Sequence, residues 1–232
     1  MNNIYLGAYI IFGIVAILSY IVNSMLQNRF KKYSAIPLGN GMTGSDVAEK
    51  MLSDNGIANV TITSIRGELT DNYNPINRTL NLSDPVYGIN SVAAAAVAAH
   101  ECGHAIQHAT AYRWLTMRTK LVPFVSFASR WMQWVLLSGI LLIQVFPALM
   151  VAGIILFGIT TLFSFITLPV EINASQRAVA WLERSRIVDS RTKPAAVDAL
   201  KWAAYTYVIA ALGSLATLVY YIMIFLSSQR RN

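Results

Sequence analysis

Residues 148–168 read ALMVAGIILFGITTLFSFITL and contain no Asp, Glu, Lys or Arg. A helix rises about 1.5 Å per residue, so a run of this length spans the roughly 30 Å hydrocarbon core of a bilayer. Comparable apolar runs occupy residues 4–26, 122–146 and 203–226. The runs predict a mainly α-helical membrane protein with about four transmembrane helices, in which residues 122–168 form a hairpin around Pro147.

The composition and the placement of charge agree with a membrane protein. Hydrophobic residues make up 55% of the chain and charged residues 12%, whereas soluble proteins contain about 25% charged residues. The net charge of +7 does not indicate a nucleic-acid partner, because the basic residues flank the apolar runs instead of sharing one soluble face. These flanking residues are Arg29, Lys31, Lys32, Arg113, Arg118, Lys120, Arg177, Arg184, Arg186, Arg191 and Lys193.

The basic flanks also predict the orientation. Residues 4–26 begin uncharged and are followed by Arg29, Lys31 and Lys32, the reverse of a cleaved signal peptide. We therefore expect an uncleaved anchor with its N-terminus outside. Positive loops stay in the cytoplasm, so we expect the polar region that follows the anchor to be cytoplasmic.

Residues 37–113 form this polar region, which we expect to fold as a small water-exposed α+β subdomain. Thr43 or Ser45 suits the cap of a helix that runs to about Asn55, and Gly56 suits its C-terminal end. Such caps predict where the helix starts and stops.

The same region contains two strand-like stretches, residues 59–65 and 79–82, on either side of the turn-rich residues 71–75. They predict a small hairpin or sheet edge. A sheet edge can bind an extended peptide through main-chain hydrogen bonds, so residues 59–65 are a candidate substrate-pairing strand; alternatively they only close the sheet. A further helix is expected from about Ser91.

Residues 100–104 read HECGH and match the pattern H-E-x-x-H. On a helix, His100 and His104 lie one turn apart on the same face, where both imidazoles can bind one zinc ion. Glu101 is angularly adjacent, so its carboxylate can act on a water molecule at the metal without being a ligand. The alternative interpretation is a polar helix face without a metal.

A catalytic zinc site has three protein ligands and one open position, so a third ligand is needed. His108 is a poor candidate, because eight residues of unbroken helix separate it from His100 by about 12 Å along the axis. We expect His108 to lie on the helix face or to support the ligands from outside.

Glu171 is the best candidate for the third ligand. It follows residues 148–168 and Pro169, and we expect it at the start of a helix within residues 169–201, on the same side of the membrane as His100. The alternative is a glutamate that is favoured at a helix start by the helix dipole. Weaker candidates on the polar subdomain are Glu49, Glu68 and Asp84.

Three segments carry a family resemblance: residues 69–75 (LTDNYNP), 98–107 (AAHECGHAIQ) and 167–175 (TLPVEINAS). With them the chain resembles the bacterial membrane-associated neutral zinc metallopeptidases, which are related to the heat-shock membrane proteases and the CAAX prenyl endopeptidases. The resemblance covers most of the chain. It implies a zincin-like subdomain within a protein of the bacterial cell membrane.

The resemblance also implies roles for individual residues. His100, His104 and Glu171 would bind Zn²⁺, and Glu101 would be the catalytic base. The family pattern has His and Asp where this chain has Asn72 and Asn74, and Asp where it has Asn173, so no role in supporting the ligands or binding substrate is carried over to these three positions.

Together these features predict a membrane-anchored zinc-dependent endopeptidase that hydrolyses peptides or membrane proteins at the cytoplasmic surface of the bilayer. Tyr73, Arg78 and His108 are candidates for stabilising the developing oxyanion. The alternative is a non-catalytic zinc-binding membrane scaffold or chaperone. A transporter is disfavoured, because apart from Arg130 the apolar runs contain almost no ionisable residues. The sequence does not indicate the oligomeric state.

Overall fold

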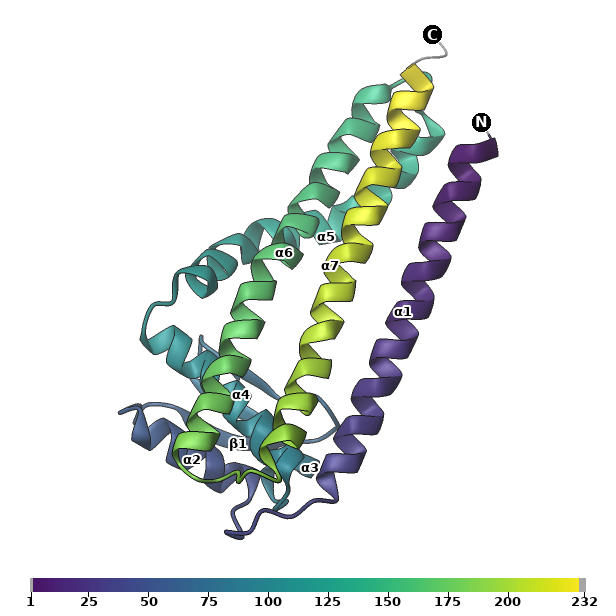
Figure 1. The fold of residues 1–232 in the computed structure, drawn as a ribbon. Helices are drawn as coiled ribbons and strands as arrows, with labels where there is room; N and C mark the ends of the chain where they lie inside the picture. Colours follow the sequence, from purple (N-terminus) through teal and green to yellow (C-terminus); the bar gives the residue numbers. More distant parts are fainter. Residues whose placement is uncertain (1, 230–232) are drawn as a thin grey trace. The chain divides into compact units, whose positions relative to one another are not determined.

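The computed structural model describes residues 2–229, which are mainly helical, as expected (Figure 1). The helices are α1 (Asn2–Ser34), α2 (Gly44–Asp54), α3 (Asp84–Tyr87), α4 (Val92–Ala109), α5 (Arg113–Leu141), α6 (Pro147–Arg184) and α7 (Lys193–Gln229). The strands are β1 (Thr61–Ile65), β2 (Asn72–Asn74) and β3 (Thr79–Ser83).

The chain divides into two compact units. We call one the helical unit; it contains Met1–Ile21, Met117–Leu168 and Tyr207–Asn232. The other, the sheet unit, contains Val22–Thr116 and Pro169–Thr206. The boundaries fall within α1, α5, α6 and α7, so each of these helices contributes residues to both units.

Three helices are long and apolar enough to cross a membrane. They contain the candidate spans Tyr9–Ser34, Pro147–Arg184 and Lys193–Gln229, with mean hydropathies of 2.0, 2.4 and 2.2. The expected fourth span, residues 122–146, is not confirmed: α5 does not meet the same criterion over the described residues. This helix contains Arg130 and ends at Leu141, before the end of the apolar run.

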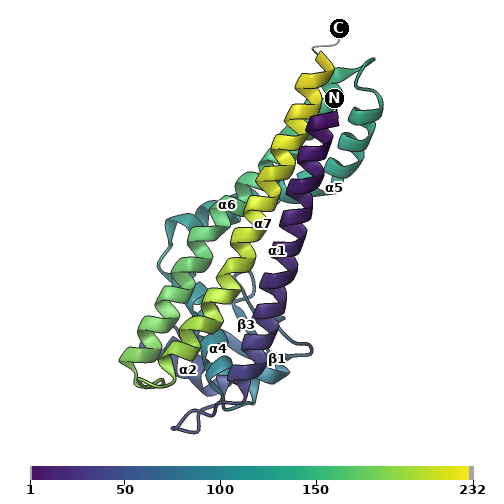
Figure 2. The same ribbon diagram turned by 45° about the vertical axis from the view of Figure 1, so that its right-hand side comes forward.

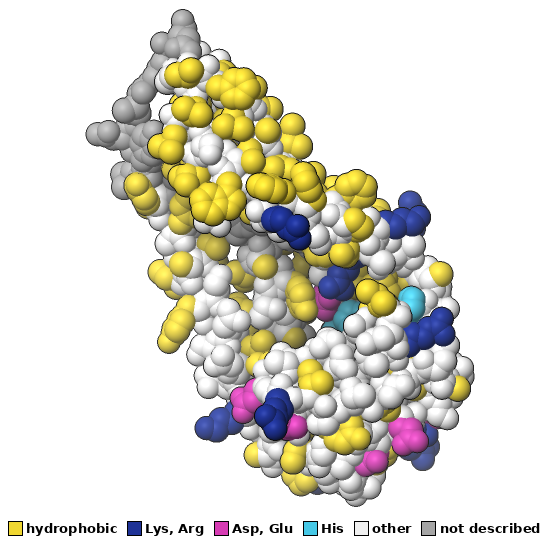
Figure 3. Space-filling view, turned by 180° about the vertical axis from the view of Figure 1, so that it is seen from behind, with side chains coloured by type: hydrophobic (Ala, Val, Ile, Leu, Met, Phe, Trp, Pro, Cys, Tyr) yellow, Lys and Arg dark blue, Asp and Glu magenta, His cyan; other side chains and the backbone are white. Residues whose placement is uncertain are grey.

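The helical unit exposes many large apolar side chains. On α5 these include Phe124 at 63%, Phe127 at 61% and Trp134 at 63% exposure. Figure 3 shows hydrophobic side chains gathered densely on this unit, while acidic side chains lie on the sheet unit. Exposed apolar surface of this extent marks a membrane or protein contact, and together with the three candidate spans it favours lipid.

The sheet has the strand order β1-β3-β2. Of the two alternatives for residues 59–65 and 79–82, the hairpin is wrong, because β1 and β3 are parallel. The sheet edge is confirmed, because β1 is an outer strand of the sheet. Two parallel strands need a crossover between them, and here that connection contains β2. The hairpin forms between β2 and β3, which pair antiparallel with Tyr73 opposite Leu80.

The helix ends in the sheet unit follow the local capping signals. Thr43 caps α2 in a capping box with Asp46, and Gly56 follows the helix with a φ of +69°. Ser91 caps α4 by accepting a hydrogen bond from the backbone N–H of Ala94. The expected starts of both helices are confirmed.

The core of the sheet unit is built around α4. Its alanines at positions 93–96, 98 and 99 are fully buried, and α2, α3, β2 and β3 all pack against it. The strands lie beside α4 in Figure 2. Small side chains allow this close packing, so α4 becomes a buried platform for the polar residues of its second half.

The structure corrects the expected start of the helix that carries Glu171. We expected a helix to begin after Pro169, but α6 runs without interruption from Pro147 to Arg184 with Pro169 inside it. A proline removes one helical hydrogen bond and disfavours helix in the residue before it, but it need not end a long helix. Glu171 is therefore in the interior of a helix, which excludes the interpretation as a helix-start glutamate.

Candidate metal centre

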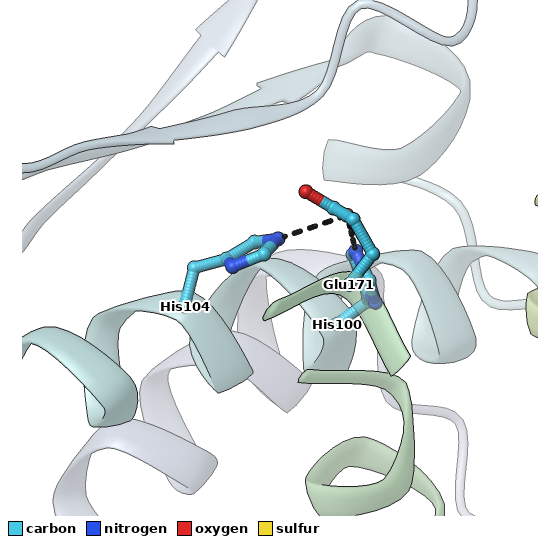
Figure 4. A group of neighbouring side chains, drawn as sticks. All are labelled: His100, His104 and Glu171. Carbon is cyan, nitrogen blue, oxygen red and sulfur yellow. Dashed lines mark ion pairs between the residues drawn. The ribbon is translucent and has the colours of Figure 1, made fainter. Parts of the chain in front are cut away.

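His100 and His104 lie one turn apart on α4, with ring centroids 4.8 Å apart in an edge-to-face arrangement. Both side chains are 12% exposed. Figure 4 shows the two rings on the same side of the helix, facing Glu171 of α6. The spacing in the sequence therefore produces the shared face that a metal ion requires.

Glu171 supplies the third donor atom. Its Oε2 lies 3.3 Å from Nε2 of His100 and 3.4 Å from Nε2 of His104, and its side chain is 3% exposed. The ligand atoms of the three residues all lie within 4.8 Å of one another. The structure thus brings together the three residues that the sequence proposed as metal ligands, from two helices far apart in the chain.

The other acidic and histidine candidates are not part of this group. In the described part of the chain, it comprises only His100, His104 and Glu171. His108 is exposed and contacts Tyr73 instead, and Asp84 accepts a hydrogen bond from Ser64. Glu49 and Glu68 are also outside the group.

The two middle residues of the motif face different neighbours. The Sγ of Cys102 is buried and donates to the backbone oxygen of Ala48 at 3.6 Å, so this side chain belongs to the core. At Gly103, an added Cβ would lie 2.7 Å from the backbone oxygen of Ala174 on α6. Gly103 therefore permits the close crossing of α4 and α6, a role that sequence reasoning missed.

The remaining nitrogens of the two imidazoles have partners in the protein. Nδ1 of His100 lies 3.0 Å from Oγ of Ser175, and Nδ1 of His104 lies 3.1 Å from Oε1 of Gln107. Such outer contacts orient metal-binding histidines and leave Nε2 for the metal. Two nitrogens and one carboxylate oxygen form a donor set typical of zinc, so the residues fit this ion.

Ser175 and Gln107 were also missed by sequence reasoning, although both lie in the segments that carry the family resemblance. Each follows its site residue at helical spacing, Ser175 four residues after Glu171 and Gln107 three after His104. This spacing was the signal that could have identified them.

Glu101 lies next to the donor group and is 8% exposed. Burial raises the pKa of its carboxyl, and the charges of Glu171 and Asp71 raise it further, while His100 and His104 act in the opposite direction. A carboxylate with a raised pKa is a better proton acceptor than one in water. Glu101 is therefore a candidate for the general base.

The protonation of His104 is linked to the same carboxylates. Burial by itself lowers the pKa of His104, but the hydrogen bond with Glu171 and the charges of Glu101 and Glu171 outweigh this effect, so the pKa is raised. A proton and a metal ion compete for the same lone pair. Metal affinity is therefore expected to fall on acidification.

Beyond His104 on α4, the hydroxyl of Tyr73 lies 2.9 Å from Nδ1 of His108. Burial raises the pKa of the Tyr73 hydroxyl, opposed by the charge of Arg78, so the hydroxyl keeps its proton at neutral pH. Arg78 is exposed. This contact brings strand β2 to the end of the helix that carries the motif.

The asparagines at the three departures from the family pattern have hydrogen-bonding roles. Asn72 accepts from Asn81, and Asn74 accepts from the backbone N–H of Ile76. Asn173 accepts from both Gln107 and Arg177. Asn72 and Asn74 shape the β2 segment, whereas Asn173 belongs to the contact between α4 and α6.

The fold and the site define the class: a membrane-associated protein with a buried His-His-Glu group that is suited to a metal ion. The chain belongs to the family described as "Putative neutral zinc metallopeptidase", whose sequence model matches residues 8–226. It is also 40% identical over 215 residues to the "Putative membrane protease YugP" of Bacillus subtilis (strain 168). The matched residues cover 93% of this chain and 95% of the relative. The resemblance inferred from the sequence is confirmed. No solved structure matches the chain.

Proposed function

We propose that the protein is a membrane-anchored zinc-dependent endopeptidase. The observation that carries the proposal is the convergence of His100, His104 and Glu171, whose ligand atoms lie within 4.8 Å of one another, with Oε2 of Glu171 at 3.3 Å and 3.4 Å from the two Nε2 atoms. The family to which the chain belongs supports zinc as the ion. A structural zinc site is closed by four protein ligands, so a group of three favours catalysis over a non-catalytic scaffold or chaperone.

Zinc, when bound, supplies Lewis acidity and lowers the pKa of water toward about 7. Glu101 accepts the proton of the attacking water and then delivers it to the amine nitrogen of the leaving peptide. Burial of Glu101 supports this role, because it makes the carboxylate more basic. The water oxygen forms the new bond to the scissile carbonyl carbon while the peptide C–N bond breaks.

The developing oxyanion needs a hydrogen-bond donor besides the metal. Tyr73 and His108 are the candidates that the fold favours, because His108 follows His104 by one helical turn and Tyr73 contacts it. The Tyr73 hydroxyl remains protonated at neutral pH and can donate.

The substrate is proposed to bind as an extended strand along β2. This strand packs against α4 and pairs only with β3 among the described strands. β1, which the sequence suggested for this role, lies at the opposite edge of the sheet. Main-chain pairing accepts varied sequences, which suits peptides and membrane-protein segments as substrates.

The sheet unit is proposed to face the cytoplasm, with the N-terminus of α1 outside. The basic residues that follow the first apolar run support this orientation. Cys102 is the only cysteine and is fully buried, so a Glu68→Cys variant would carry one accessible thiol. A membrane-impermeant maleimide should label this variant only after the cells are permeabilised. Equal labelling of intact cells would contradict the orientation.

The catalytic proposal is tested with the purified full-length protein. Glu101→Gln should bind zinc as the unchanged chain does and cleave a membrane-protein substrate about 10²- to 10⁴-fold more slowly. Asp84→Asn is the control, because Asp84 lies outside the donor group. Unchanged turnover by Glu101→Gln would exclude Glu101 as the base.

A further inference from the structure

Gln107 is a fully buried polar side chain on α4 for which the catalytic proposal has no role. Its Nε2 donates to the backbone oxygen of Val170 at 2.8 Å and to Oδ1 of Asn173 at 3.0 Å, both on α6. Its Oε1 lies 3.1 Å from Nδ1 of His104. A buried amide without partners costs free energy, and here each end of the amide is satisfied.

These partners determine which way the amide points. The oxygen of Val170 can only accept a hydrogen bond, so the nitrogen end of Gln107 must face it. Asn173 agrees, because its Oδ1 also accepts from Nε of Arg177 and therefore faces donors. The oxygen end of Gln107 must then face His104.

The orientation of the amide in turn determines the state of His104. Because Oε1 of Gln107 can only accept, Nδ1 of His104 must carry the proton, and the lone pair of the neutral ring is left on Nε2. This is the nitrogen that faces Glu171. Ser175, the partner of His100, has a hydroxyl that can donate or accept, so it does not impose one tautomer.

We infer that Gln107 is a positioning residue: it holds His104 in the tautomer that binds a metal through Nε2 and ties this ring to α6 beside Glu171. Val170 directly precedes Glu171 in the chain, so one side chain links a ligand on α4 to the backbone that carries the ligand on α6. The inference rests on the proposed function, because it assumes that His104 binds zinc.

The test compares two substitutions of similar size. Gln107→Met removes all three hydrogen bonds, whereas Gln107→Glu keeps an acceptor for Nδ1 of His104 but places a carboxylate against the oxygen of Val170. If Gln107 only filled space, the apolar methionine would be tolerated better than the buried charge. If Gln107 positions His104, zinc affinity should follow the opposite order.

Zinc affinity is measured by chelator competition on the full-length protein, and coordination geometry by the absorption spectrum of the cobalt-substituted protein. We expect Gln107→Met to raise the zinc Kd about 10- to 100-fold, as loss of an outer contact to a ligand typically does, and to change the cobalt spectrum. Gln107→Glu should lose less affinity than Gln107→Met. Ile106→Val is the matched control, because Ile106 is the neighbouring buried residue of the same helix. The zinc affinity and the cobalt spectrum of this variant should equal those of the unchanged chain.

The inference is overturned if Gln107→Met binds zinc as tightly as the unchanged chain with the same cobalt spectrum, or if it binds more tightly than Gln107→Glu. If Gln107→Met does not fold, the comparison of Gln107→Glu with Ile106→Val decides. A zinc Kd for Gln107→Glu more than about 100-fold above that of the control would then exclude the role of the acceptor. Failure of the proposed function looks different: the unchanged chain would then bind no zinc, or would bind zinc and cleave no substrate, whatever the order of the two variants.

Discussion

The helical unit and the sheet unit use buried and exposed surface in opposite ways. On the helical unit, large apolar side chains such as Leu162 are 53% exposed, so few positions depend on one particular neighbour. In the sheet unit, polar side chains such as Glu101, Gln107 and Glu171 are buried, and each needs a specific partner. The contrast teaches that the apolar helices suit a membrane, while the sheet unit contains the candidate metal site.

The largest expected effect is at the crossing of α4 and α6 in the sheet unit. In Gly103→Ala, the new Cβ would lie 2.7 Å from the backbone oxygen of Ala174, so the helix that carries Glu171 must move. We expect zinc affinity to fall about 100-fold or more, the upper range for disturbing the surroundings of a ligand. Chelator competition measures this change.

Gly88→Ala is the control for Gly103→Ala, because an added Cβ at Gly88 meets nothing within 4 Å. It should bind zinc normally. Normal zinc binding by Gly103→Ala as well would mean that the helix crossing does not determine the site.

Tyr73→Phe should have the next largest effect. If the hydroxyl stabilises the oxyanion, its removal should lower kcat about 10²- to 10³-fold and leave zinc affinity unchanged. Steady-state kinetics with a peptide substrate separate kcat from KM. Tyr87→Phe, also in the sheet unit, should behave as the unchanged chain, and an unaltered kcat for Tyr73→Phe would exclude this donor.

A matched pair of leucines compares the stability of the two units directly. Leu82 in the sheet unit is fully buried, whereas Leu162 in the helical unit is 53% exposed. Leu82→Ala should lower the free energy of unfolding by about 2–5 kcal/mol, and Leu162→Ala by less than about 0.5 kcal/mol. Thermal unfolding in detergent measures both, and equal losses would contradict the contrast between the units.

The smallest predicted effect concerns the cap of α2. Thr43→Ala removes the hydroxyl's half of the capping box with Asp46, while the backbone N–H of residue 43 still donates to Asp46, and should cost about 1 kcal/mol of stability. The hydrogen bonds from Thr43 lower the pKa of Asp46. The ionised Asp46 carboxylate therefore contributes to the free energy of unfolding above its unfolded pKa of about 3.9. This contribution is lost as the pH falls through the lower pKa of the folded state. Unfolding measured between pH 7 and pH 3 should show the difference between the two proteins shrinking at the acid end.

The sequence predicted features that depend on local pattern. The apolar runs indicated long helices, Thr43 and Ser91 marked helix starts, and residues 100–104 placed two imidazoles on one face. It failed where the answer depends on partners distant in the chain. The parallel pairing of β1 and β3 required knowledge of the crossover.

The same limitation applied to the site. Pro169 was interpreted as a break, although α6 continues through it, because a local helix signal does not include the packing that stabilises the helix. Gly103, Gln107 and Ser175 have roles only because α4 crosses α6 at this point. The helical spacing of Gln107 from His104 and of Ser175 from Glu171 could have indicated a shared face, but not what that face would contact.

The most direct test of the central claim is the zinc content of the purified full-length protein and of two glutamate variants on the same helix. The unchanged chain should contain about one zinc ion per chain, as expected for a mononuclear site, and Glu171→Ala should lose it. Glu183→Ala should retain it, because Glu183 is exposed and pairs with Lys193. Equal zinc in Glu171→Ala and Glu183→Ala, or none in the unchanged chain, would contradict the claim that His100, His104 and Glu171 hold the metal.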